Sequence, residues 1–343
     1  MKEIVATDKA LMRRALYLAT LGEGLVSPNP MVGAVIFADG RIIGEGYHRQ
    51  YGGPHAEPNA IRSVAAADRH LLKESTMYVT LEPCSHYGKT PPCAQLIIDT
   101  GIPRVVVGAG DPFVKVSGRG IRMMREAGIE VEEGLLAEES RKLNRRFFTA
   151  HTLGRPYILL KWAQTSDGYI GKPDRRLMIS SPLSEVWMHR ERASADGIMV
   201  GTDTVIKDNP SLTCRLWPTR NPEERPVRLS FDTERLPKDS KFACSRHVLK
   251  RKDESLRDFM SRIYAEEGIT SLMVEGGAKT LNSFIEENLF EEIRIEISPA
   301  IAENGVKAPD ICHLLEEGTI RKVKETQARS NNIYVFESKG LKF

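Results

Sequence analysis

Three potential metal ligands and one carboxylate stand close together in the first third of the chain. His55 is followed by Glu57, and two cysteines, Cys84 and Cys93, come later. One imidazole and two thiolates supply three ligands to Zn²⁺ and leave the fourth position for water, as in catalytic zinc sites. Zinc lowers the pKa of that water to about 7, and Glu57 is placed to move protons without binding the metal. Such parts serve attack of hydroxide on an amino-bearing ring carbon, with ammonia leaving.

The spacing of the two cysteines bears on the kind of zinc site. Zinc deaminases usually carry P-C-x-x-C, whereas eight residues separate Cys84 from Cys93 here. A structural zinc site is the alternative, but it normally has four protein ligands. His86 is either a fourth ligand or a loop histidine near the cavity. We predict a catalytic site with His55, Cys84 and Cys93 as zinc ligands.

A second candidate site lies in the later part of the chain, at VEGGAKT (residues 274–280). The chain has no G-x-G-x-x-G fingerprint and no Walker loop. The segment does offer a strand ending in Glu275, two glycines, and a helix opening at Ala278. Backbone N–H groups at such a helix N-terminus favour phosphate binding. A purely structural Gly-Gly turn is the alternative interpretation.

The elements that must position the first site alternate between strand-like and helix-like segments, which predicts an α/β unit of about five strands. A hairpin is expected at Asp39-Gly40, and Asp8 is expected to cap the first helix. Pro58 falls in the first turn of a helix, where a missing N–H costs little. The expected strands are 31–37, 41–48, 76–81, 104–107 and 129–131, and the expected helices are 9–21, 55–67, 120–127 and one starting near Cys93.

The basic, amphipathic segment 138–148 is expected to form a last helix and a connector. We therefore place the domain boundary near Arg145, with domains of 1–145 and 146–343. The alternation then restarts, which predicts a second α/β unit. Its expected strands are 157–162, 197–200, 227–231, 271–274 and 293–297, and its expected helices are 184–195, 256–267 and 279–287.

Composition limits the class of protein. The 343 residues are 41% hydrophobic and 28% charged, which is ordinary for a globular protein of two domains. The net charge is +3, divided as +1 before and +2 after Arg145, so neither half is the basic body of a nucleic-acid-binding domain. No apolar stretch is long enough to span a membrane, and the N-terminus lacks the apolar core of a signal peptide. Five cysteines do not suit a disulfide framework, so we expect a cytoplasmic protein.

Several motifs of the first half closely resemble the bifunctional deaminase/reductase family of riboflavin biosynthesis, called RibD or RibG. They are SPNPMVG (27–33), GEGYH (44–48), PHAE (54–57) and LEPCSHYGKTPPC (81–93). The resemblance implies a cytidine-deaminase-like α/β/α domain with one Zn²⁺ on His55, Cys84 and Cys93. Glu57 would be its catalytic proton shuttle. Asn29 and His48 would line the substrate pocket, with packing or turn roles as the alternative.

The resemblance continues through the second half, at KWAQTSDG (161–168), GTDT (201–204), DNPSLTCR (208–215) and VEGG (274–277). It implies a dihydrofolate-reductase-like α/β domain that binds NADPH. Arginines are suited to a 5′-phosphate because they form charge-assisted forks. The alternative roles are a solvent-exposed helix face for Arg192 and ordinary packing for Leu212. The implied cofactor contacts are Ala163, Thr204, Asp208, Thr233, Gly277, Ala278, Lys279, Thr280, Leu281, Asn282 and Ser283, and the implied substrate contacts are Arg192, Leu212, Arg215 and Glu275.

The second half also departs from the family at two positions. Met178 stands where the family often has tryptophan, and Arg176 occupies a nearby serine position. A thioether does not reproduce an aromatic stacking surface. Asp167 is either a general acid or base or a turn residue, because Asp-Gly is a turn signal. The roles of Cys214, Cys244 and Cys312 are left open, and buried apolar packing is the default expectation for all three.

The resemblance implies hydrolytic deamination of 2,5-diamino-6-ribosylamino-4(3H)-pyrimidinone 5′-phosphate, then NADPH-dependent reduction of its ribosyl group to ribityl. The product would be 5-amino-6-ribitylamino-uracil 5′-phosphate. The expected partner is this small molecule, without nucleic acid or membrane, and the family suggests a homo-oligomer. The alternatives are a deaminase with an inactive reductase domain, a nucleic-acid-editing deaminase with an accessory domain, and a non-catalytic zinc-stabilised binding module.

Overall fold

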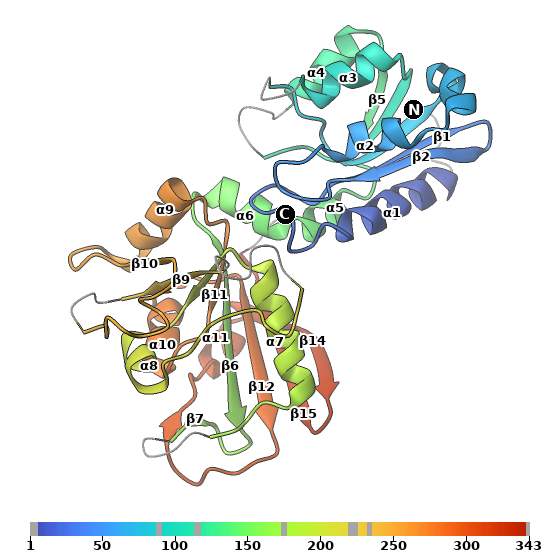
Figure 1. Ribbon diagram of the computed structural model, residues 1–343. Helices are drawn as coiled ribbons and strands as arrows, with labels where there is room; N and C mark the ends of the chain where they lie inside the picture. The colour runs from blue at the N-terminus through green and yellow to red at the C-terminus, as the bar shows by residue number, and fades with distance from the viewer. Residues whose placement is uncertain are drawn as a thin grey trace. The chain divides into compact units, whose positions relative to one another are not determined.

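The computed structural model divides the chain into two units, each built on its own sheet (Figure 1). The first unit ends at Thr152 and the second begins at Leu153. The structure describes residues 6–86, 91–112, 118–172, 177–218, 226–231 and 235–340. Within these ranges, no helix combines the length and the apolar character that crossing a bilayer requires.

The sheet of the first unit has five strands in the order β2-β1-β3-β4-β5. β1 pairs antiparallel with β2 and β3, while β3, β4 and β5 are parallel. Parallel strands need crossover connections, and here helices provide them. The strands are β1 (Gly33–Ala38), β2 (Arg41–Tyr47), β3 (Thr76–Leu81), β4 (Arg104–Ala109) and β5 (Glu130–Glu133).

Helices cover both faces of this sheet, so the unit has three layers. Helices α2, α3 and α4 bury Ala60, Ile97 and Met124 against one face. Helix α1 buries Met12 and Ala15 against the other. The helical segments are α1 (Ala6–Thr20), α2 (Ala56–Ser63), the 3₁₀ segment η1 (Ala66–Glu74), α3 (Cys93–Thr100), α4 (Arg119–Glu126), α5 (Ala137–Leu143) and α6 (Arg145–Leu153).

Two local predictions for the first unit are wrong. Asp8 does not cap the first helix, because α1 already includes Ala6; the buried Asp8 carboxylate instead accepts a 2.5 Å hydrogen bond from the Tyr78 hydroxyl. The segment predicted as one connector helix forms two helices, α5 and α6. They part at Asn144, whose side chain bonds the backbone of Met31.

The sheet of the second unit has eight strands in the order β10-β9-β8-β11-β6-β12-β15-β14. The pairs from β10 to β12 are parallel, and β15 and β14 continue the sheet antiparallel. These strands are β6 (Tyr157–Thr165), β8 (Gly197–Met199), β9 (Val227–Ser230), β10 (His247–Leu249), β11 (Ser271–Val274), β12 (Glu292–Ser298), β14 (Ile320–Ala328) and β15 (Asn331–Ser338), and β7 (Tyr169–Gly171) pairs separately with β13 (Val306–Lys307).

The helices of the second unit bury apolar side chains on both faces of its sheet. Phe259 of α9 and Phe284 of α10 belong to the large cluster with Leu160 of β6. Met188 of α7 packs on the opposite face with Leu159. The helices are α7 (Pro182–Ser194), α8 (Thr202–Asp208), α9 (Leu256–Glu267), α10 (Ala278–Glu286) and α11 (Cys312–Glu316).

The division between the units falls seven residues beyond the boundary expected at Arg145. The difference has a packing cause. Phe148 of α6 is buried with Leu81 and Ala109, so most of this helix belongs to the first unit. The C-terminal hairpin of β14 and β15 was not among the expected elements.

Candidate active sites

The three predicted zinc ligands come together where two helices begin. His55 immediately precedes α2, Cys93 is the first residue of α3, and Cys84 lies in the loop after β3. Their ligand atoms all lie within 4.8 Å of one another. His55 Nδ1 is 3.4 Å from Cys93 Sγ and 3.8 Å from Cys84 Sγ. Tetrahedral zinc holds such nitrogen and sulfur ligands about 3.6 Å apart, so the cluster fits the ion.

The protonation of this cluster suits a cation. Hydrogen bonds from Cys93 and His55 lower the pKa of the Cys84 thiol to about 4. The hydrogen bond with Cys84 raises the pKa of His55 to about 9. The same neighbouring thiolate, together with burial, raises the pKa of Cys93. Without metal the cluster therefore keeps protons beside an anionic sulfur, and a dication replaces them when it binds.

Glu57 is buried beside the predicted zinc ligands. Its side chain is 3% exposed, and Oε2 has no hydrogen-bond partner among the described residues. Burial raises the pKa of this carboxyl. A buried carboxylate oxygen without a partner is costly. Its position, two residues after His55 on the first turn of α2, therefore suits a group whose partner arrives with the reactants.

His48 is fixed as a neutral imidazole by its two neighbours. Its Nδ1 lies 3.0 Å from the Pro54 carbonyl, which only accepts, so Nδ1 carries the proton. Its Nε2 is then the acceptor for the Asn29 side-chain amide at 3.2 Å. Burial lowers the pKa of His48, which keeps the ring neutral. The predicted pocket residues Asn29 and His48 are thus hydrogen-bonded to each other.

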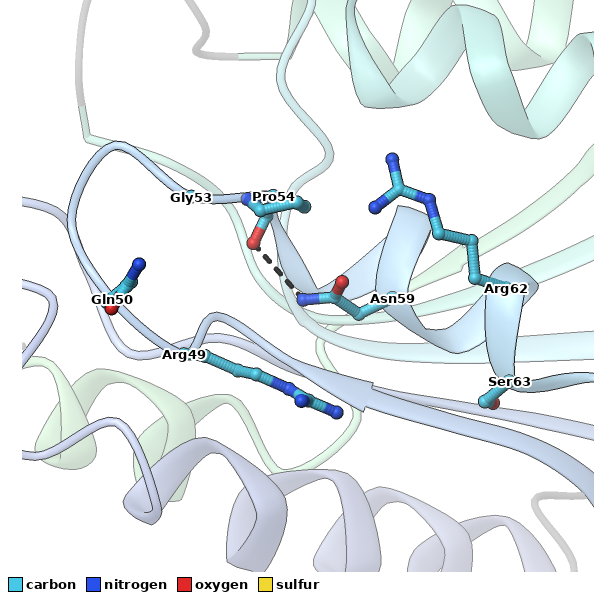
Figure 2. A pocket seen from close by; sticks show the side chains of 7 residues that line it. All are labelled: Arg49, Gln50, Gly53, Pro54, Asn59, Arg62 and Ser63. Carbon is cyan, nitrogen blue, oxygen red and sulfur yellow. Dashed lines mark hydrogen bonds between the residues drawn. The ribbon is translucent and has the colours of Figure 1, made fainter.

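Asn59 stabilises the position of the Pro54 carbonyl that binds His48. Its amide donates to the carbonyls of Tyr47 and Pro54, and Figure 2 shows the bond to Pro54. Asn59 and Pro54 line a cavity of about 550 Å³ that contains none of the predicted site residues. Arg49 and Arg62 lie on its rim as exposed side chains (Figure 2). Within this cavity, the residue that bears on the zinc site is Asn59, because it holds the Pro54 carbonyl that orients His48.

A separate cavity of about 380 Å³ lies at the predicted zinc site. It is lined by the predicted residues Asn29, His48, His55, Glu57 and Cys84. His86 also lines it but is not part of the ligand cluster, which favours the loop-histidine interpretation. Sequence reasoning missed four polar or aromatic lining residues, namely Glu82, Asp111, Phe147 and His151.

Glu82 fastens the segment that follows β4 to the zinc loop. Its buried carboxylate accepts hydrogen bonds from the backbone N–H groups of Asp111, Gly118, Gly120 and Ile121, at 2.9–3.4 Å. Gly120 approaches so closely that a Cβ there would stand 2.0 Å from the Pro83 carbonyl oxygen. The sequence does contain a signal for Glu82. It is the L-E-P-C motif, in which Glu82 stands two residues before Cys84.

In the second unit, two predicted cofactor segments meet at one edge of the sheet. β8 and β11 are parallel neighbours, so the segments after their carboxyl ends lie side by side. Gly201 and Gly276 make the contact possible. A Cβ on Gly201 would lie 2.5 Å from Thr280 Oγ1, and one on Gly276 would lie 2.8 Å from Thr280 Cβ. The loop before α10 therefore has little space for side chains, as a backbone phosphate site requires.

The other predicted cofactor residues have different surroundings. Leu281 is fully buried in the core, so its side chain does not face a ligand. Asp208 is an exposed residue at the end of α8, and Ala163 is half-buried in β6. Thr233 lies outside the described residues. The remaining predicted contacts follow Gly277 on α10, namely half-buried Ala278, exposed Lys279, and half-buried Asn282 and Ser283.

Arg192 and Glu275, predicted as separate substrate contacts, bind each other. Arg192 Nε and Nη2 donate to the two carboxylate oxygens of Glu275, at 2.8 and 2.5 Å. Burial alone would raise the pKa of Glu275, but Arg192 outweighs it and the pKa is lowered. Leu212 is 4% exposed and packs in a small apolar cluster, as its packing alternative expects. Arg215 is exposed nearby in sequence.

His189 of α7 is a further buried group near this pair. It is 0% exposed, and neither ring nitrogen has a hydrogen-bond partner among the described residues. Burial, together with the charges of Arg192 and Arg215, lowers its pKa to about 4. The nearby Thr213 carbonyl opposes this shift only in part. His189 is therefore an uncharged ring beside the Arg192–Glu275 pair.

The remaining alternatives of the second unit separate clearly. Asp167 accepts hydrogen bonds from the backbone N–H groups of Ala302 and Glu303, which favours the turn role. Its pKa is lowered, first by Thr165. Met178 is 64% exposed, and Arg176 lies outside the described residues. Of the cysteines expected as buried packing, Cys214 is buried; for the other two the expectation is wrong, because Cys244 and Cys312 are exposed.

Comparison with known proteins accounts for both units. Residues 5–109 match the cytidine and deoxycytidylate deaminase zinc-binding region, and residues 156–330 match the RibD C-terminal domain. The riboflavin biosynthesis protein RibD of Aquifex aeolicus is 39% identical, covering 96% of this chain and 98% of its own. RibD of Acinetobacter baumannii has a similar structure, with a TM-score of 0.87 and 29% identity over 97% of this chain and 99% of that one.

The structure of a diaminohydroxyphosphoribosylaminopyrimidine deaminase/5-amino-6-(5-phosphoribosylamino)uracil reductase from Thermotoga maritima is also similar. Its TM-score is 0.83 and its identity 34%, over 96% of this chain and 98% of that one. Sequence and structure comparisons thus agree over nearly the whole chain, across both candidate sites.

Proposed function

The chain belongs to the RibD family of riboflavin biosynthesis proteins, and from this we propose which residues of each unit perform the two reactions. Both parts of a bifunctional deaminase/reductase are present, the zinc-binding deaminase region and the reductase domain. The proposed substrate of the first reaction is 2,5-diamino-6-ribosylamino-4(3H)-pyrimidinone 5′-phosphate, which loses an amino group as ammonia. The second reaction reduces the ribosyl group of that product to ribityl with NADPH.

The observation that carries the deaminase assignment is the buried Glu57 carboxylate beside the three-ligand cluster, with an Oε2 atom that has no hydrogen-bond partner among the described residues. His55, Cys84 and Cys93 would hold the zinc, which supplies activation of the attacking water when bound. Glu57 takes the proton from that water and passes it to the leaving amino group. Its raised pKa suits this role, because a carboxyl that titrates closer to neutral pH both accepts and donates efficiently.

Asn29 and His48 are proposed to orient the pyrimidine ring. The Asn29 amide offers a donor and an acceptor, and the neutral His48 ring is held rigidly by the Pro54 carbonyl. Rigid polar groups in a partly apolar cavity give a small ligand its orientation. Neither side chain needs to change its protonation during the reaction, which leaves proton transfer to Glu57.

The reductase assignment is supported by the glycine-lined start of α10. Backbone N–H groups at Gly277 and Ala278 would bind a cofactor phosphate, and Thr204 lies close by. NADPH supplies the hydride when bound. The Arg192–Glu275 pair would act as a unit toward the substrate, with Glu275 held ionised by Arg192. Exposed Arg215 remains available for the substrate's 5′-phosphate.

The proposal extends to the setting of the enzyme. A cytoplasmic location is proposed from the cysteine content, and a homo-oligomer from the family resemblance. Five free thiols, two of them zinc ligands here, accord with a reducing compartment. The near-neutral net charge of +3 accords with a small-molecule substrate in place of nucleic acid.

The deciding experiment incubates the purified, zinc-loaded protein with the proposed substrate, with and without NADPH, and reads the products by mass. Exchange of an amino group for oxygen is expected in both samples, and gain of two hydrogens only where NADPH is present. Deamination without reduction would show that the departures at Arg176 and Met178 disable the second site. Absence of both reactions with zinc verified would refute the assignment and direct attention to RNA binding at moderate salt.

A further inference from the structure

Helix α6 places two aromatic rings in the wall of the zinc cavity. Phe147 and His151 are four residues apart, so they lie on the same face of the helix. Both line the cavity that holds His55 and Glu57. Their ring centroids are 4.3 Å apart at an interplanar angle of 67°, an edge-to-face contact. The two rings thus form one aromatic surface, which we call the α6 wall.

The α6 wall is anchored to the rest of the first unit at two residues, Asn144 and Phe148. The buried Asn144 side chain, just before α6, makes two 2.8 Å hydrogen bonds with the backbone of Met31. Met31 lies between Pro30 and Val32, which both line the same cavity. Phe148, the neighbour of Phe147, is buried against Leu81 and Ala109 at the ends of β3 and β4. The wall is therefore held by the sheet that carries the zinc loop.

The side chains that line the cavity indicate what the α6 wall contacts. Most other lining side chains are polar or ionisable, and its aliphatic lining comes from prolines, Val32 and Leu81. Among the described lining residues, Phe147 is the only aromatic ring besides the histidines. A flat ring such as a pyrimidine binds well against a flat aromatic face. Burial lowers the pKa of His151, so the second ring of the wall is also uncharged.

We propose that Phe147 is a specificity-determining residue that contacts the pyrimidine ring of the deaminase substrate, and that His151 is a positioning residue that holds the Phe147 ring in place. The inference rests on the deaminase function proposed above. It assigns part of the deaminase site to a helix that follows the matched zinc-binding region, which ends at residue 109. It also gives the first unit a reason to retain α6.

Two phenylalanines of the first unit provide a matched test in the full-length, zinc-loaded enzyme. Phe147→Leu keeps an apolar side chain but removes the flat ring. Phe37→Leu makes the same change in β1, where Phe37 packs against the cluster that α1 covers and lines no part of the zinc cavity. Phe147→Leu is expected to raise KM for the diaminopyrimidine substrate on the order of tenfold with little change in kcat, because stacking stabilises ground and transition states alike. Phe147→Tyr should restore KM, and His151→Ala should raise it less than Phe147→Leu.

The control separates contact from folding. Phe37→Leu should lower Tm and leave KM unchanged, while Phe147→Leu should keep its zinc and its reductase activity. An unchanged KM in Phe147→Leu, or an equal rise in both leucine variants, would overturn the proposal.

A binding measurement distinguishes this inference from the function beneath it. Calorimetric titration of the substrate into Glu57→Gln, alone and combined with Phe147→Leu or Phe37→Leu, needs no turnover. Binding that weakens only with Phe147→Leu supports the wall even if the wild-type enzyme fails to deaminate, in which case the deaminase assignment alone is wrong. Substrate affinity that is the same with and without Phe147→Leu, or no binding at all, overturns the inference.

Discussion

Glu57 and His189 are buried groups with atoms that lack hydrogen-bond partners among the described residues, one in each unit. Such groups are expensive in a fold and are kept where a reactant or a charge needs them. Glu57 faces the zinc ligands, and burial raises its pKa. His189 lies beside arginines that lower its pKa to about 4. Opposite shifts follow from one cause, since burial disfavours the charged form of either group.

Glu57→Gln tests the proton-transfer role at this scale. Deamination should fall by about two to four orders of magnitude, because glutamine keeps the size of the side chain but cannot carry a proton. Zinc content and NADPH-dependent reduction of the deaminated compound should stay unchanged. Mass analysis of products and metal analysis of the protein measure both. Substantial deamination by the variant would exclude Glu57 as the shuttle.

His189 predicts a pH dependence of stability in the second unit. Its folded pKa of about 4 lies below the ordinary 6.5, so between these values the unfolded chain binds a proton that the folded chain does not. Stability should therefore fall as the pH falls from 6.5 to 4. Calorimetric Tm across this range should drop less steeply for His189→Gln than for wild type. Parallel curves would show that the ring is not neutral in the folded protein.

Helix starts and the turns before them are the elements that build both sites. His55 and Cys93 stand at the starts of α2 and α3, and Gly277 precedes α10. Glu82 does similar work for α4, since its carboxylate accepts the N–H groups of Gly120 and Ile121 in the first turn. Ends of helices have free N–H groups, so they naturally collect thiolates, carboxylates and phosphates.

Glu82→Gln should loosen the zinc loop without removing a ligand. A neutral amide has one acceptor oxygen where the carboxylate has two, so two of the four backbone bonds lose their acceptor. The first unit should lose about 2–3 kcal/mol of unfolding free energy, because each bond to a charged group is stronger than a neutral one. Chemical denaturation with zinc bound measures this. Wild-type stability would contradict the fastening role of Glu82.

Adjacent glycines before α10 predict two different outcomes. Gly276→Ala places a Cβ 2.8 Å from Thr280 Cβ, so the second unit should lose about 1–3 kcal/mol through overpacking. At Gly277 the nearest atom would be Thr204 Oγ1 at 3.8 Å, so Gly277→Ala should fold normally. If this turn binds the cofactor phosphate, Gly277→Ala should raise KM for NADPH. Denaturation and reductase kinetics distinguish the two, and an unchanged KM in Gly277→Ala would argue against the phosphate site.

The whole molecule is two units with separate sheets and separate cores, and each candidate site is built from residues of one unit. This organisation suits two reactions that need different cofactors, zinc for the hydrolytic one and NADPH for the reductive one. The chain between them is not a passive connector, because α6 contributes to the first core through Phe148 and to the zinc cavity through Phe147.

Truncation tests where the first unit ends. A fragment ending at residue 152 should bind zinc and deaminate, because it keeps α6 up to the division between the units. A fragment ending at residue 145 loses Phe147, Phe148 and His151, and should have a lower Tm and a raised KM. Equal behaviour of the two fragments would place the functional border where the sequence alone suggested, near Arg145.

The amino-acid sequence by itself predicted the cluster of His55, Cys84 and Cys93 with Glu57 beside it. It also predicted the five strands of the first sheet and five of the eight strands of the second. These are local signals. A ligand set at strand-to-helix junctions and runs of alternating apolar residues are encoded by neighbours in the chain. The hairpin of β14 and β15 carried such a signal too, in the alternation of Ile333, Val335 and their neighbours, and was overlooked.

Only the tertiary structure decided the contacts between distant segments. Asp8 was expected to cap a helix but is bound by Tyr78, seventy positions away. Arg192 and Glu275 looked like independent substrate contacts, yet they neutralise each other across the fold. Phe147 lines the same cavity as His55, and the bonds between Asn144 and Met31 tie its helix to that cavity. Such pairs depend on how the sheet brings its ends together, and no periodicity along the chain contains that information.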